Sequence, residues 1–217
     1  MEETEAMSCM AWISLVKDLV VAAAAATGAI VAVMGLTTWK RQLHGQNEYE
    51  LARRLLVTTF KYRDEIDKVR NPVMFNEEQP VPPDDEAGNM NDNQVRHYGV
   101  SHAYQARWDA VRAVRVNLDA DLLEAEAMWG SELTNLYQTI FNLQHELFND
   151  IRQYLELINP RTQPAMREAL VDIRRTQRDV MYDLSGAEPD DYKRELLASI
   201  DVIKGHLMPY LMHDQRE

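Results

Sequence analysis

One uninterrupted apolar run, from Leu19 to Trp39, constrains this chain more than any other stretch. It holds no charged residue, and aliphatic side chains lie on both sides of five consecutive alanines at 22–26. A helix of roughly 20 mainly apolar residues crosses a bilayer core about 30 Å thick, so the sequence predicts a transmembrane helix at residues 19–39. The alternatives are a helix buried in a soluble core and an interfacial helix, although the run lacks the Lys or Arg of an interfacial polar face.

The residues around this run predict its orientation. The short N-terminal segment 1–18 is acidic, with four carboxylates and one basic residue. Lys40 and Arg41 follow the run directly, and Arg53 and Arg54 come later. By the positive-inside rule, we expect the N-terminus outside and the rest of the chain in the cytoplasm. The same four basic residues are candidate contacts for anionic lipid headgroups. The alternative is that they are topology charges and a solvated helix face.

Small residues in the apolar run suggest self-association. Ala24, Gly28 and Ala32 are spaced four apart, so they share one helix face, where small side chains let two membrane helices approach closely. A run so rich in alanine also produces this spacing by chance. The face is therefore a candidate for helix–helix association and for a homo-oligomer.

From residue 46 onward, apolar residues recur at spacings of three and four, which is typical of amphipathic helices. The pattern predicts helices at about 46–70, 95–129, 131–158, 165–184 and 189–210. The strongest apolar stripe belongs to 131–158, where Gln144 is the one polar member, which we interpret as fixing helix register. No segment has the period of a strand. The sequence thus predicts an all-α fold, with one N-terminal transmembrane helix and an antiparallel helical bundle, elongated if its helices are long, at 40–217.

Two connections leave alternatives open. His44-Gly45 either breaks the chain between the apolar run and the bundle or lies within one long helix. Residues 71–94 contain four prolines and six acids but no basic residue, a composition that does not form a packed core. We expect a mobile acidic loop there. It is a solvated connector or, alternatively, a docking segment for a basic partner.

The chain offers no recognisable catalytic motif. None of its six histidines follows a carboxylate by three residues, so the Glu-x-x-His pairs that hold metals in helical bundles are missing. Nucleophile motifs and Gly-rich phosphate loops are also missing, and Cys9, the one cysteine, has no placed histidine partner. We therefore expect no enzyme, no catalytic, metal-binding or cofactor-binding residue, and no cofactor. The net charge of −12 argues against a nucleic-acid partner.

One resemblance covers roughly residues 11–72. The Ala/Gly-rich span, then TWKRQLHGQNEYELARRLL, then KYRDEIDKVRNP, resembles the N-terminal part of uncharacterised bacterial single-pass membrane proteins. The resemblance implies a bacterial inner-membrane setting and carries no activity or site residue.

Three functions are compatible with these patterns. The first is a membrane-tethered helical interaction module, a scaffold, sensor or accessory protein that binds a protein partner or itself. The second is a pore-forming or membrane-perturbing effector that oligomerises through the face of Ala24, Gly28 and Ala32. The third is an enzyme with an unrecognised site in the bundle, which would need convergent polar groups in a pocket.

Overall fold

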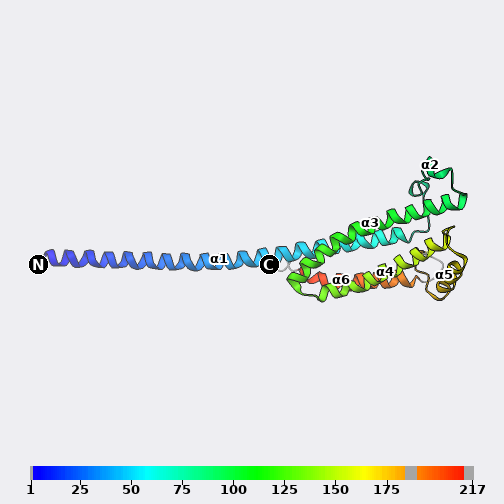
Figure 1. Ribbon diagram of the computed structural model, residues 1–217. Coiled ribbons are helices and arrows are strands. Elements are labelled where there is room, and N and C mark those ends of the chain that lie inside the picture. The colour runs from blue at the N-terminus through cyan, green and yellow to red at the C-terminus, as the bar shows by residue number, and fades with distance from the viewer. Residues whose placement is uncertain (1, 184–189, 213–217) are drawn as a thin grey trace. The chain divides into compact units, whose positions relative to one another are not determined.

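The computed structural model describes residues 2–183 and 190–212 (Figure 1). Every regular element in these ranges is helical, which confirms the all-α prediction. The long helices are α1 (Glu2–Val69), α3 (Asp92–Trp129), α4 (Glu132–Ile158), α5 (Pro164–Thr176) and α6 (Asp191–Met212). Two short elements, the 3-10 helix η1 (Asn76–Glu78) and α2 (Asp84–Ala87), lie between α1 and α3.

The chain forms two compact units, Met1–Tyr49 and Glu50–Glu217. α1 contributes residues to both units, because its helical hydrogen bonding passes through His44-Gly45 without interruption. Of the two alternatives for that dipeptide, the structure shows the continuous helix.

The predicted transmembrane helix at 19–39 is not supported by the structure. Within the described part of the chain, no helix has the length and apolar character of a membrane span. The side chains of Leu19, Ala22 and Ala23, like those of residues 1–16, lie outside the described ones.

The second unit is a helical bundle whose centre is α4. The helices α1, α3, α4 and α6 run in alternating directions, so that α3 returns beside the end of α1 and α6 returns beside α4 (Figure 1). α4 packs against α3, α5 and α6 because its apolar residues cover a broad face. Its buried apolar residues are Leu133, Tyr137, Ile140, Leu143, Leu147 and Ile151.

Local sequence signals explain where the helices begin and end. Asn91 caps α3 by accepting a hydrogen bond from the backbone N–H of Gln94, whose side chain accepts in return from Asn91 N. Gly130 ends α3 with a φ of 82°, a conformation that costs glycine little. Pro164 opens α5 at a position where its missing N–H has no cost.

The helix predicted at 165–184 ends earlier than its pattern indicates, since α5 stops at Thr176. The next residues leave the helix: the side chain of Asp179 accepts a hydrogen bond from Met181 N, and Val180 and Met181 are buried in the core. Non-helical backbone here leaves the Val180 carbonyl free to accept from the side chain of Arg70. The predicted end, Leu184 to Gly186, lies outside the described residues.

The first part of the acidic segment 71–94 lies against α3. Arg107 donates to the carbonyls of Asn71 and Val73 at 2.8 and 2.7 Å and pairs with Glu78 at 2.6 Å. A Cβ on Gly99 would lie 3.2 Å from the Cβ of Gln79, so glycine allows this close approach.

The central position of α4 generates a stability prediction. Leu147 is fully buried, so Leu147→Ala should leave a cavity and lower the free energy of unfolding by about 2–5 kcal/mol. Val116→Ala is the matched control, because Val116 is 67% exposed and should change stability by about 0.5 kcal/mol or less. Urea unfolding followed by circular dichroism measures both. Equal losses for the two variants would contradict a core centred on α4.

Candidate functional site

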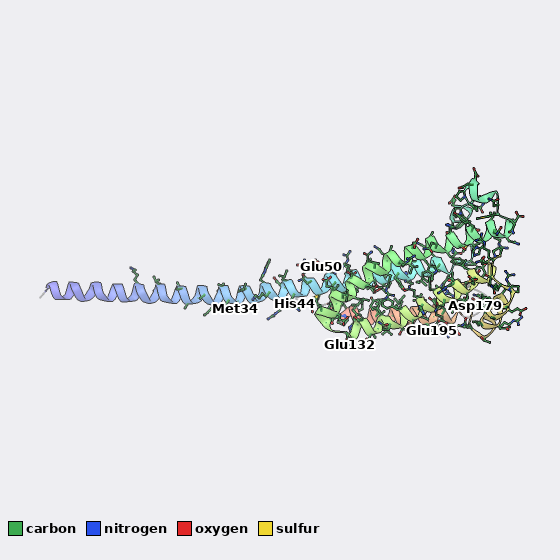
Figure 2. All side chains as sticks on the ribbon, viewed as in Figure 1. Met34, His44, Glu50, Glu132, Asp179 and Glu195 are labelled. Carbon is green, nitrogen blue, oxygen red and sulfur yellow. The ribbon has the colours of Figure 1, made fainter. Side chains whose placement is uncertain are left out.

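The first unit presents an exposed apolar surface. Every side chain described between residues 24 and 44 is exposed. Its large apolar side chains, each between 57% and 64% exposed, are Val20, Val21, Ile30, Val31, Val33, Met34, Leu36 and Trp39. Figure 2 shows the position of Met34 among these exposed residues of α1. The candidate association residues Ala24, Gly28 and Ala32 are exposed as well, and a Cβ built on Gly28 would meet nothing within 4 Å.

The four candidate headgroup residues fall into two groups. Lys40, Arg41 and Arg53 are exposed and form no ion pair with any described residue. Arg54 instead turns toward α3, where it pairs with Asp121 at 2.6 Å and with Glu124. Its hydrogen bond to Asp121 raises its pKa, so its charge already has intramolecular partners.

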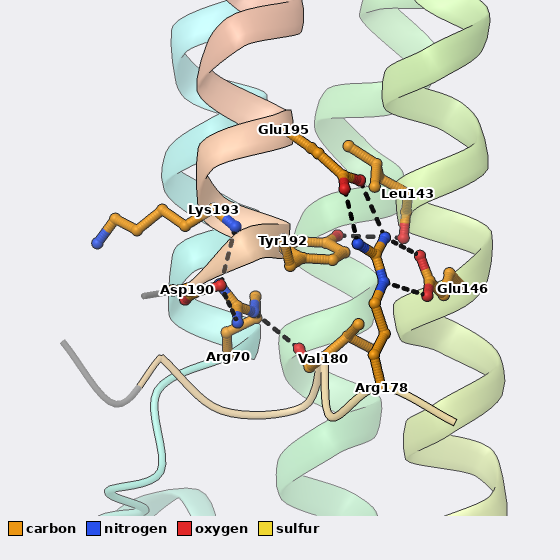
Figure 3. Close-up of polar contacts among 9 residues, drawn as sticks. All are labelled: Arg70, Leu143, Glu146, Arg178, Val180, Asp190, Tyr192, Lys193 and Glu195. Atoms are coloured by element: carbon orange, nitrogen blue, oxygen red, sulfur yellow. Dashed lines mark hydrogen bonds and ion pairs between the residues drawn. The ribbon is translucent and has the colours of Figure 1, made fainter. Parts of the chain in front are cut away.

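A buried arginine at the end of α1 organises the polar contacts of the bundle (Figure 3). Arg70 is 1% exposed. Its Nε donates to the Val180 carbonyl at 2.8 Å, and its Nη2 donates to the Tyr182 carbonyl at 3.0 Å. It also pairs with Asp190 at 2.8 Å and lies over the ring of Tyr192. These contacts join the end of α1 to the segment before α6.

Neighbouring contacts extend this cluster to α4. The hydroxyl of Tyr192 donates to the Leu143 carbonyl at 3.1 Å. Arg178 bridges two helices, because it donates to both carboxylate oxygens of Glu146 on α4 and of Glu195 on α6 (Figure 3). The hydrogen bond from Arg178 lowers the pKa of Glu195. Together these contacts form a structural clamp that joins the end of α1, the segment before α6, α4 and α6.

Gln144 lies half-buried, between α1 and α3. Its Oε1 accepts from the hydroxyl of Tyr62 and from Arg115 Nη1, the latter at 3.0 Å. Burial raises the pKa of Tyr62, so this phenol stays protonated and donates at neutral pH. Gln144 therefore makes specific contacts to two other helices, as a residue that fixes register would.

A groove of about 540 Å³ lies between α3 and α4. Its floor includes Trp108 and Phe148, whose rings meet edge to face with centroids 5.3 Å apart. Three arginines, Arg112, Arg115 and Arg152, line it, and no carboxylate is among its lining residues. Trp108 Nε1 is buried and has no acceptor in the described part of the chain.

A second cavity, of about 630 Å³, lies between α4 and α5. It is lined by charges of both signs that largely pair with one another: Arg178 with Glu146, and Asp150, at the wall, with Arg174 at 2.7 Å. Burial raises the pKa of Asp150, although Arg174 opposes this shift. The described residues contain no group of His, Cys, Asp and Glu that could hold a metal ion.

Sequence reasoning missed both Arg70 and the arginine-lined groove. Arg70 follows the buried stripe of α1 and precedes Asn71-Pro72, where a helix-ending arginine is expected to face solvent. The groove combines Arg112 and Arg115 of α3 with Arg152 of α4. The three arginines come together only when the two helices pack in register, so their sequence spacing carries no signal. A comparison of the chain with protein-family models, with curated proteins and with solved structures finds no match.

The clamp generates the second stability prediction. Arg70→Met keeps most of the side-chain volume but removes the guanidinium that pairs with Asp190 and donates to two carbonyls. We expect the free energy of unfolding to fall by about 3–5 kcal/mol, because Asp190 loses its ion-pair partner, although it still accepts from Lys193 N. Urea unfolding measures the loss, and limited trypsin digestion should cleave after Arg178 sooner than in the unmodified chain.

The control for Arg70→Met is Arg161→Met, which removes one exposed guanidinium outside both cavities. Arg161→Met should leave stability within about 0.5 kcal/mol of the unmodified chain. If Arg70→Met unfolds at the same urea concentration as this control, the clamp has no structural role.

Proposed function

We propose that this chain is a membrane-tethered helical interaction module of the bacterial inner membrane. Residues 19–39 span the bilayer, and the bundle binds a protein partner or a second copy of the chain in the cytoplasm. The observation that supports this proposal is the apolar surface of the first unit. Every side chain described from Val20 to Leu43 is exposed.

Apolar surface of this extent has a free-energy cost in water, roughly 25 cal/mol for each Å² exposed. Soluble monomers rarely keep contiguous apolar patches of more than a few hundred Å². A helix that is apolar on all sides is covered by a protein core or by lipid. The bundle core is already occupied by residues of the second unit, so a bilayer is the cover that the sequence favours.

The residues at the end of the apolar run fit the cytoplasmic interface of a bilayer. Trp39 is 64% exposed, and Lys40 and Arg41 follow it with no ion pair to any described residue. Trp and Tyr concentrate at headgroup level, and Lys and Arg on the cytoplasmic side. Arg54 is not part of this proposed contact, because its guanidinium pairs with Asp121 and Glu124 of α3.

The bundle then acts from a surface to which it is tethered. A tether raises the local concentration of the bundle near membrane-bound partners, so a modest contact surface suffices for binding. The polar groups of the clamp join helices to one another and leave no catalytic constellation among the described residues. This arrangement favours an interaction role over an enzymatic one.

Membrane fractionation tests the span. The unmodified chain should stay in the membrane pellet after extraction with alkaline carbonate and should be released by detergent. The double variant Val31→Arg with Met34→Arg puts two charges where each costs about 2.5–3.5 kcal/mol at the centre of a spanning helix. We expect this variant to move to the carbonate supernatant.

The matched control for fractionation is Val116→Arg with Val202→Arg, which adds the same charge at positions 67% and 57% exposed on α3 and α6. This control should stay in the pellet. An unmodified chain found in the soluble fraction without detergent would overturn the proposed span, as would equal pelleting of the two double variants.

A further inference from the structure

The groove between α3 and α4 has an apolar floor that is held in place by packing. Trp108 and Ile151 are 6% and 1% exposed, whereas Phe148 is 42% exposed and presents its ring at the surface. The edge-to-face contact of Trp108 and Phe148 has an interplanar angle of 79°. Such a contact orients the two rings, so the floor offers preformed aromatic surface to a ligand.

The rim of this groove is basic, although the whole chain carries a net charge of −12. Arg112 pairs with Asp109 at 2.5 Å, and this pair is exposed on α3. Arg115 pairs with Asp119 and donates to Gln144, which holds its guanidinium beside the groove. Arg152 of α4 makes no ion pair with any described residue, so its charge is available to a ligand.

The other cavity, between α4 and α5, differs in that the carboxylates of Glu146, Asp150 and Glu156 line it. Arg178 pairs there with Glu146, and Asp150 pairs with Arg174, which lies outside the lining. Arg152 lines both cavities. Arg112 and Arg115 also have carboxylate partners, but Asp109 and Asp119 do not line the groove. An anion that approaches Arg152 therefore meets a lining without carboxylates on the groove side and a lining with carboxylates on the other, so the groove is the favoured side.

We propose that this groove binds a small organic anion, a molecule with an aromatic or aliphatic body and one carboxylate, sulfonate or phosphate. Its volume of about 540 Å³ lies in the range of small-molecule sites, roughly 300–1,000 Å³. The apolar body packs on Phe148 and over Trp108, and the anionic group accepts hydrogen bonds from Arg152 and Arg112. Guanidinium groups suit this role because their planar fork matches an oxyanion.

The size of the floor argues against a partner helix as the occupant. A stable protein interface buries about 800 Å² on each side, whereas most of the groove's aromatic and aliphatic floor is already buried within the bundle. Phe148 is its one large apolar side chain with more than a third of its surface exposed among the described residues. This surface suits a molecule of one or two rings.

Calorimetric titration tests the proposal with three probes of graded chemistry. The full-length chain, held in nanodiscs of a zwitterionic lipid, is titrated with 2-naphthoate, with its neutral analogue 2-naphthamide and with acetate. Empty nanodiscs supply the blank for partition into lipid. We expect saturable binding of one 2-naphthoate per chain, at least tenfold weaker binding of 2-naphthamide, and no measurable binding of acetate.

Two groove variants and one control locate the bound probe. Arg152→Gln should weaken 2-naphthoate binding by roughly tenfold, because it removes a charge-assisted hydrogen bond. Phe148→Ala should weaken it through the lost ring contact. Arg161→Gln removes an equal charge outside both cavities and should leave binding unchanged. Circular dichroism checks that each variant keeps its helical content.

Several results would overturn the proposal. These are a titration indistinguishable from empty nanodiscs, 2-naphthamide that binds as tightly as 2-naphthoate, and equal effects of Arg152→Gln and Arg161→Gln. If Phe148→Ala fails to fold, Arg152→Gln still decides, because its side chain lies on the exposed side of α4.

Discussion

The removal of apolar side chains from water organises both units of this chain. In the second unit, α4 buries a broad face against α3, α5 and α6, and the last turns of α1 add Leu51, Leu55 and Ile66 to the same core. In the first unit, the described side chains of the apolar run are exposed. The proposed span accounts for this difference, since the bilayer would remove these apolar side chains from water as the core does in the bundle.

Once the apolar faces are paired, polar contacts determine how the ends of the helices are joined. Arg70 is buried with its partners supplied by two backbone carbonyls and Asp190. A buried guanidinium is tolerated only when its donors are satisfied, so the segment after α5 must stay non-helical to offer those carbonyls. Arg178 joins α4 to α6 from the same segment. Figure 3 shows that both arginines act where three parts of the chain meet.

Much of the bundle could be predicted from sequence, because the spacing of apolar residues along a helix indicates which face of that helix is buried. The stripe of Leu133, Tyr137, Ile140, Leu147 and Ile151 lies in the core as its spacing indicates, and Gln144 contacts two other helices. The end of α5 could not be predicted from the local pattern. The Val180 carbonyl, in the non-helical segment after α5, accepts a hydrogen bond from Arg70, which lies more than a hundred residues away in sequence. The arginine-lined groove also depends on packing between helices. The orientation and the span of residues 19–39 stay predictions.

Labelling of single cysteines in intact bacteria tests the central claim most directly. Cys9 is the one native cysteine, so a membrane-impermeant maleimide reports on the N-terminal side of the apolar run without any substitution. A second chain, with Cys9→Ser and Val116→Cys, reports on the exposed surface of α3. The account predicts that Cys9 is labelled in intact cells and that position 116 is labelled only after lysis. Labelling of both positions only after lysis would show that residues 19–39 do not cross the membrane, and the reverse pattern would keep the span but invert its orientation.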